Sequence, residues 1–148
     1  MRYSASGGTL NDHLSGPRPL VGIVLPNWNG LRDTIECLRS LAAIDYPRLE
    51  ILVIDNGSVD GSADTLARKD GGFFFIASPE NIGFAKANNL GIDFFLDRGA
   101  DYVLLLNNDT VVDPDFLDRL LVVAESRPNG GVFGPKILSY ADRRRRAR

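Results

Sequence analysis

The sequence predicts an α/β protein with a Rossmann-like, doubly wound and mostly parallel sheet. Short apolar runs rich in Val, Ile and Leu alternate along the chain with segments whose apolar residues recur at helical spacing. Two of these runs, residues 49–54 and 102–106, stop abruptly at polar clusters that begin with Asp55 and Asn107. Continuous apolar runs of this length are typical of strands buried on both faces, as in parallel sheets. Their alternation with helices favours a doubly wound arrangement.

The first part of the pattern predicts a strand, a helix and a second strand. The strand covers residues 20–25 and is expected to end at Pro26. The helix covers residues 31–43, where apolar residues recur at helical spacing. It must end before Pro47, because the residue that precedes a proline is kept out of the helical region. The second strand covers residues 49–54.

The middle of the chain predicts two more helices, each followed or preceded by a strand. A helix over residues 62–69 leads through a glycine turn to a strand over 73–76. A helix over 84–98 carries an apolar face and ends at Gly99, a residue suited to a helix C-terminus. The fourth strand is the Leu-rich run over 102–106.

The last predicted elements are a helix and a short strand. Asp113 followed by Pro114 has the form of an N-cap with proline at the first helical position, opening a helix that runs to Ser126. Apolar residues at 132–133 and 137–138 predict a final short strand. The expected order is therefore βαβαβαβαβ, without an internal repeat.

Length and composition indicate one globular domain. The chain has 148 residues, of which 44% are hydrophobic and 24% charged. We expect a mobile Gly-, Ser- and Pro-rich leader over residues 1–19, a folded domain over 20–140 and a basic tail over 141–148. No apolar run approaches the ~20 residues of a membrane span, and the leader lacks the apolar region of a secretion signal. A cytoplasmic protein, at most peripheral to a membrane, is expected.

The distribution of charge and the numbers of cysteine and histidine residues argue against several kinds of partner and site. The tail contains five of the 17 basic residues, but no basic or aromatic patch elsewhere continues it. We therefore expect a solvated tail and no nucleic-acid partner. The single cysteine, Cys37, excludes an internal disulfide. The single histidine, His13, lies in the leader, which argues against zinc sites and Ser-His-Asp triads.

Two carboxylates follow predicted strands at the point where each strand ends. Ligands of open parallel sheets bind outside the carboxyl ends of the strands, so Asp55 and Asp109 can share one pocket. Asp55 can accept hydrogen bonds from a base or ribose, or form a turn with its own loop. Asp109, with the neutral oxygen of Asn107, can hold Mg²⁺ or Mn²⁺, or belong to a turn before the next helix. With one charge here, a bound diphosphate would supply much of the metal coordination.

Two more loops lead to the same edge of the predicted sheet. Gly83 allows close backbone approach before a helix whose N-terminus favours an anion. Lys86, one turn into that helix, can face a phosphate or solvent. The first loop brings the amides of Asn27 and Asn29, and Trp28 can stack on a base or pack against the first helix. The glycine patterns of dinucleotide-binding and P-loop proteins do not occur.

Four segments, taken in order, resemble the nucleotide-binding half of family 2 glycosyltransferases with the GT-A fold. They read VGIVLPNWN (21–29), IDNGSVDGS (54–62), NIGFA (81–85) and LNND (106–109). Each is modest alone, but four in this order and spacing are specific, and the resemblance covers residues 19–140. The Asn-Asn-Asp form of the last motif is most similar to the rhamnosyltransferase-like branch.

The residues and the resemblance together give nine candidate nucleotide-sugar-binding residues: Pro26, Asn27, Asn29, Asp55, Asp60, Gly83, Lys86, Asn107 and Asn108. The resemblance implies that Asp55 bonds the uracil or thymine ring and that Asp60 lies near the base or ribose. It also implies that Asp109 holds the divalent Mg²⁺ or Mn²⁺ that bridges the diphosphate.

The implied activity is inverting transfer of a sugar, for instance rhamnose, from a UDP- or dTDP-sugar to a glycan or lipid-linked acceptor. No general base is evident after Asp109. The alternative is a stand-alone nucleotide-sugar-binding module, or a truncated fragment without the acceptor half, whose site is completed by self-association or by a partner chain. A sugar nucleotidyltransferase is disfavoured, because the Gly-rich loop with Arg or Lys that follows its first strand is absent.

Overall fold

The computed structural model describes residues 17–139; most of the expected leader and the basic tail lie outside the described residues. The strands are β1 (Val21–Asn27), β2 (Leu49–Asn56), β3 (Phe74–Ser78) and β4 (Tyr102–Leu105). The helices are α1 (Leu31–Leu41), α2 (Ser62–Ala67), α3 (Phe84–Asp97) and α4 (Phe116–Glu125). The strands and α1 to α3 belong to one compact unit that ends at Pro114, and α4 belongs to a second. Among residues 17–139, no helix is both long and apolar enough to cross a membrane.

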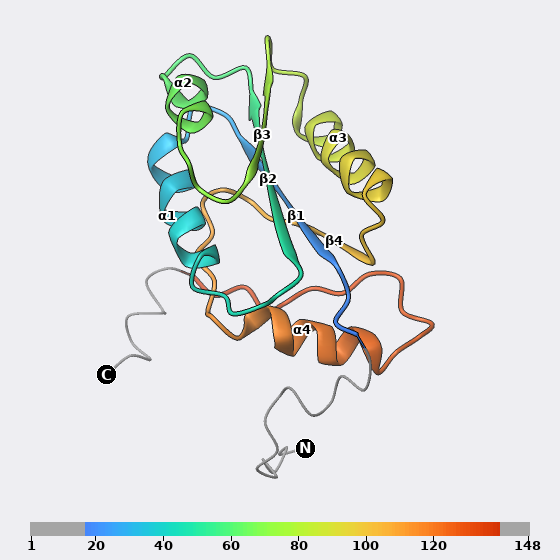
Figure 1. Ribbon diagram of the computed structural model, residues 1–148. Coiled ribbons are helices and arrows are strands. Elements are labelled where there is room, and N and C mark those ends of the chain that lie inside the picture. Colours follow the sequence, from blue (N-terminus) through green and yellow to red (C-terminus); the bar gives the residue numbers. More distant parts are fainter. Residues whose placement is uncertain (1–16, 140–148) are drawn as a thin grey trace, which may run out of the picture. The chain divides into compact units, whose positions relative to one another are not determined.

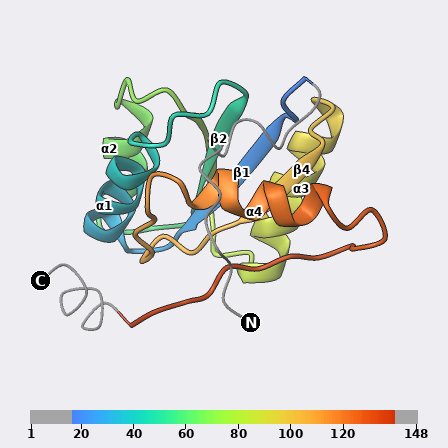
Figure 2. The same ribbon diagram turned by 90° about the horizontal axis from the view of Figure 1, so that it is seen from below.

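The sheet is parallel throughout and has the strand order β3-β2-β1-β4. Helices α1 and α2 cover one face and α3 covers the other (Figures 1 and 2). The predicted doubly wound α/β fold is thereby confirmed. The strand order reverses between β1 and β4, and ligands of such sheets bind outside the carboxyl ends of the strands at this point.

One part of the apolar core lies between α3 and the central strands. Val24, Leu52, Ile54, Ala87 and Phe95 are fully buried there and form one apolar cluster. Burying a Val, Leu, Ile or Phe side chain fully stabilises the fold by about 1.5–3 kcal/mol. Glycines in β1 and α3 let the helix approach the sheet closely, since a Cβ atom at either one would overlap a buried core side chain.

Pro26 lies inside β1, so the prediction that the strand ends there is wrong. β1 pairs with β4 only as far as Val24, opposite Leu105, but it pairs with β2 as far as Asn27, opposite Asp55. On the β4 side, the Val24 carbonyl accepts the N–H of the residue after β4 at 3.0 Å. The next ladder donor on that side would be the N–H that proline lacks. Pro26 therefore ends one ladder and leaves the other intact.

The predicted last strand is also wrong. Residues 126–139 contain no strand, and the side chains of Val132 and Ile137 are 94% and 89% exposed. Apolar and β-branched residues form a strand only where a partner strand and a buried face are available. The last helix begins at Phe116 and not at Pro114. Asp115 precedes it, and its carboxylate bonds Arg119 one turn further on.

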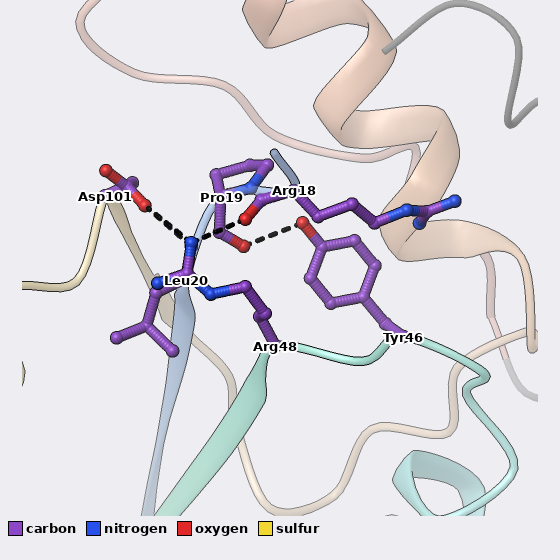
Figure 3. A network of polar contacts seen from close by, with 6 residues as sticks. All are labelled: Arg18, Pro19, Leu20, Tyr46, Arg48 and Asp101. Atoms are coloured by element: carbon purple, nitrogen blue, oxygen red, sulfur yellow. Dashed lines mark hydrogen bonds and ion pairs between the residues drawn. The ribbon is translucent and has the colours of Figure 1, made fainter. Parts of the chain in front are cut away.

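Three side chains hold the segment that enters β1 (Figure 3). The Asp101 carboxylate accepts the N–H of Leu20 at 2.7 Å, and the Tyr46 hydroxyl donates to the Pro19 carbonyl at 2.8 Å. The Arg48 guanidinium donates to the carbonyl before that proline at 2.7 Å. These bonds link the starts of β1, β2 and β4, and so they support the register that brings the opposite strand ends together.

We predict that Gly22→Ala destabilises the protein by about 1–3 kcal/mol through overpacking. A Cβ atom at this position of β1 would lie 2.3 Å from a carbon of the buried Phe95 ring. Urea unfolding followed by circular dichroism measures the change. Gly131→Ala is the matched control, because a Cβ atom there meets no atom within 4 Å. Equal stability of the two variants would contradict the close packing of α3 on β1.

Candidate functional site

A cavity of about 320 Å³ lies at the carboxyl ends of β1, β2 and β4. Five asparagines, two aromatic residues, a proline and an aspartate line it: Pro26, Asn27, Trp28, Asn56, Asn81, Phe84, Asn107, Asn108 and Asp109. Among the described residues that line it, Asp109 alone is charged. The cavity therefore offers many neutral donors and acceptors together with one carboxylate.

Asn27 is the centre of the hydrogen bonds beneath this cavity. It is fully buried at the end of β1. Its Nδ2 donates to Asp55 Oδ1 at 2.7 Å and to the Ser58 hydroxyl at 3.1 Å. Its Oδ1 accepts from the Thr34 hydroxyl at 2.8 Å and from Asn108 Nδ2 at 3.3 Å. One side chain thus joins β1 to β2, to α1 and to the loop after β4.

Asp55 lies inside β2, which continues two residues beyond its predicted end. Its side chain is 1% exposed, and it is absent from the residues that line the cavity. One carboxylate oxygen accepts from Asn27, and the other accepts the backbone N–H of Ser58 at 3.0 Å. Both oxygens are therefore engaged within the protein, on the α1 side of the sheet.

Asn56 is a cavity residue that the sequence reasoning missed. Successive strand residues point to opposite faces, so Asn56 turns away from the side that Asp55 occupies. Its Nδ2 donates to Asn81 Oδ1 at 3.0 Å, and its Oδ1 accepts the N–H of Ile82 at 2.9 Å. These bonds hold the loop before α3 against the end of β2. The period-two alternation along β2 was the signal that could have identified this residue.

Asn29 and Asp60 support neighbouring loops and do not line the cavity. Asn29 has a positive φ of 51°, and its Oδ1 accepts the N–H of Val59 at 2.8 Å. The Asp60 carboxylate accepts both the N–H and the hydroxyl of Ser62, at the start of α2. The hydrogen bond from the Ser62 hydroxyl lowers the pKa of Asp60 below its usual value.

Gly83 and Lys86 lie beside the cavity, at the start of α3. Gly83 immediately precedes the helix with a φ of 90°, and its N–H donates to Asn81 Oδ1 at 2.9 Å. Lys86 is exposed one turn further on. Neither residue lines the cavity, although their neighbours Asn81 and Phe84 do.

The loop after β4 brings Asn107, Asn108 and Asp109 to the cavity. No group of three or more His, Cys, Asp or Glu side chains that could hold a metal occurs among residues 17–139. The available ligands are the Asp109 carboxylate and amide oxygens, which are hard donors that suit Mg²⁺ or Mn²⁺. These protein groups fit such an ion only if a bound nucleotide diphosphate supplies most of the coordinating oxygens.

Cys37 lies in α1 close to the same loop. Its Sγ is 4.0 Å from the carbonyl oxygen of Asn107. Burial, together with the nearby charge of Asp109, raises the pKa of the Cys37 thiol to about 12. The thiol therefore stays protonated at neutral pH, and only the thiolate is a strong nucleophile. This agrees with a packing role for Cys37, whose side chain is fully buried.

Comparison with known sequences gives a family. The sequence profile described as Glycosyl transferase family 2 matches residues 22–148. An N-acetylglucosaminyltransferase of Mesorhizobium japonicum is 32% identical over 133 residues, which are 85% of this chain and 31% of the relative. A poly-beta-1,6-N-acetyl-D-glucosamine synthase of Staphylococcus aureus is 38% identical over 86 residues, 56% of this chain and 20% of the relative. The chain thus spans a fifth to a third of the length of these relatives.

Solved structures confirm the GT-A fold. TarS residues 1–349 of S. aureus, in complex with UDP-GlcNAc, matches with a TM-score of 0.61 and 20% identity, over 81% of this chain and 37% of that one. The mannosyltransferase PcManGT of Pyrobaculum calidifontis, in complex with GDP-Man and Mn²⁺, matches with a TM-score of 0.60 and 23% identity. That match covers 76% of this chain and 37% of the mannosyltransferase.

We predict that Asn27→Asp destabilises the protein by at least about 2 kcal/mol at pH 7. The new carboxylate would lie against the buried Asp55 Oδ1, where Asn27 Nδ2 is now 2.7 Å away. Two such carboxylates share a proton, which raises the folded-state pKa of one of them. The difference in the free energy of unfolding between wild type and Asn27→Asp should therefore become smaller as the pH falls from 7 towards 4.

Urea unfolding at several pH values tests this prediction. Asn29→Asp is the control, because Asn29 is exposed and its Oδ1 accepts a backbone N–H, as a carboxylate also can. Its effect should stay within about 0.5 kcal/mol. A pH-independent loss in Asn27→Asp would contradict the buried contact with Asp55.

Proposed function

The chain belongs to glycosyltransferase family 2, and we propose that it binds a nucleotide-diphosphate sugar in the cavity at the carboxyl ends of β1, β2 and β4. The sugar would pass with inversion to a glycan or lipid-linked acceptor. The observation that carries this proposal is the position and chemistry of the cavity. It lies where the strand order reverses, and asparagines line it around the single carboxylate of Asp109.

In this proposal Trp28, Asn56 and Asn81 face the nucleoside. Trp28 lines the cavity and is 58% exposed, which favours stacking on a base over packing against α1. The side-chain amides of Asn56 and Asn81 lie at the same wall and can meet base or ribose groups. Asp55, whose oxygens are both engaged, contributes by holding Asn27 and does not contact the base directly.

Asp109, with Asn107, would hold the divalent cation that accompanies the diphosphate. Such an ion stabilises the charge that builds on the leaving nucleoside diphosphate. The described lining residues supply a single carboxylate here, so the cation and the nucleotide should bind together and weakly apart. Around them, the neutral lining leaves the anionic donor without a second protein charge to repel it.

The names of the relatives indicate which sugar donor to test first. The curated relatives are named for N-acetylglucosaminyl transfer and for a polysaccharide of N-acetylglucosamine, which supports UDP-GlcNAc as the first donor to test. A dTDP-sugar such as dTDP-rhamnose is the alternative suggested by the Asn-Asn-Asp motif. A cytoplasmic location remains a prediction from the sequence.

The second candidate function is nucleotide-sugar binding without transfer by this chain alone. Among the described residues that line the cavity, Asp109 is the only carboxylate, and the proposal already assigns it to the cation. In this second function, a partner chain supplies the general base for the acceptor hydroxyl. Binding without transfer or hydrolysis of the sugar would favour this second function.

We predict that UDP or UDP-GlcNAc raises the melting temperature in the presence of Mn²⁺. A ligand at 100 times its dissociation constant stabilises the folded state by about 2.7 kcal/mol. Asp109→Asn keeps the side-chain shape but removes the charge, and it should abolish the Mn²⁺-dependent part of the shift. Asp93→Asn, which changes an exposed carboxylate on α3, should behave as wild type. No shift in wild type with UDP- or dTDP-nucleotides would refute the proposed function.

We also predict that Trp28→Ala weakens UDP binding. Stacking of a base on an aromatic side chain contributes about 1–3 kcal/mol, which corresponds to roughly 5- to 150-fold in affinity. Trp28→Phe should retain most of the affinity, because it keeps an aromatic face. Isothermal titration calorimetry measures both. If Trp28→Ala lowers the melting temperature and leaves the affinity unchanged, packing against α1 is its role instead.

A further inference from the structure

The hydrogen bonds around Asn27 have a fixed direction, set by Asp55. The Ser58 backbone N–H donates to one Asp55 oxygen, and an ionised carboxylate can only accept at the other. Asn27 must therefore present its Nδ2 to Asp55, at 2.7 Å. Its Oδ1 then faces the opposite way, towards α1 and the loop after β4.

This direction continues to Asn108. The Thr34 hydroxyl donates its single proton to Asn27 Oδ1 at 2.8 Å, so its oxygen can only accept from a third group. Asn108 Nδ2 supplies that donor, 3.0 Å from Thr34 Oγ1 and 3.3 Å from Asn27 Oδ1. Gly30 leaves room for the contact, since a Cβ atom there would lie 2.6 Å from Asn108 Nδ2.

We infer that Asn108 is a positioning residue whose amide ties the loop of residues 107–109 to β1 and α1 and so holds Asp109 at the cavity. The inference rests on the proposed function for the role of Asp109. It also explains the residue type: Asp55, Asn27 and Thr34 together require a donor at position 108. If position 108 carried a carboxylate, that carboxylate could accept a hydrogen bond from Thr34 only if Thr34 stopped donating to Asn27 Oδ1. The buried Asn27 Oδ1 would then have no donor and would face a negative charge.

The inferred role of Asn108 predicts an effect of Asn108→Asp on cation binding that is opposite to the effect expected from the added negative charge. An aspartate at position 108 would place two adjacent carboxylates in the loop, which alone would favour a divalent cation. If the amide positions the loop, Asn108→Asp instead frees the loop and weakens binding of the cation with its nucleotide. The two expectations have opposite signs, so one variant separates them.

The first measurement is hydrogen exchange of the nucleotide-free protein, in wild type, Asn108→Asp and Thr34→Val. The reporters are the N–H groups of Thr110, bonded to the Asn107 carbonyl, and of Val112, bonded to the Ser40 hydroxyl. We expect exchange at least about 10-fold faster at these amides in both variants, with β1 and β2 unchanged. Unchanged exchange of the loop, or an equal acceleration throughout the sheet, would overturn the inference.

The second measurement is the affinity for UDP with and without Mn²⁺. Both variants should lose at least about 10-fold in the affinity measured with Mn²⁺ and little in the affinity measured without it. Thr65→Val is the matched control, because the Thr65 hydroxyl bonds a carbonyl at the start of α2. Equal or tighter Mn²⁺-dependent binding by Asn108→Asp would overturn the inference. Failure of wild type to bind would instead reject the proposed function, and the exchange data would still decide the role of Asn108.

Discussion

The hydrogen bond between Asn27 and Asp55 is the interaction on which the rest of the site depends. Asn27, the last residue of β1, pairs in register with Asp55, the next-to-last residue of β2, and both are buried. A buried carboxylate is costly unless its oxygens are hydrogen-bonded, and here an amide and a backbone N–H satisfy it. This bond joins the central strands and orients Asn27. With Asn27 oriented in this way, its Oδ1 accepts hydrogen bonds from Thr34 of α1 and from Asn108 of the loop after β4.

The unequal lengths of the two ladders of β1 open the cavity beside this bond. Pro26 keeps its place opposite β2 but offers no N–H towards β4, so the chain after Leu105 is free to leave the sheet. The chain that leaves the sheet after β4 includes Asp109, which lines the cavity together with five asparagine side chains. The parallel sheet thus has a polar cavity at the carboxyl ends of its strands, while the cluster between α3 and the sheet is apolar and closely packed.

The sequence predicted the fold well because apolar runs and helical spacing report burial directly, and four strands and four helices appear where those patterns occur. It failed where the outcome depended on distant partners. Pro26 was expected to end a strand that has two neighbours and loses a bond to only one. The apolar residues near Val132 lack a partner strand among the described residues. Asn27 contacts Asp55 and Asn108, which lie 28 and 81 positions further along the sequence, and no local sequence pattern reveals such contacts.

The packing of Cys37 turns the single thiol of the chain into an intrinsic probe of motion. Its sulfur lies 4.0 Å from the Asn107 carbonyl oxygen, and burial keeps the thiol protonated. An alkylating reagent can reach it only when this part of the structure opens locally. The rate of thiol modification therefore reports how often the structure around Cys37 opens locally, and a ligand that stabilises the loop of residues 107–109 would slow it. No engineered label is needed to follow that movement.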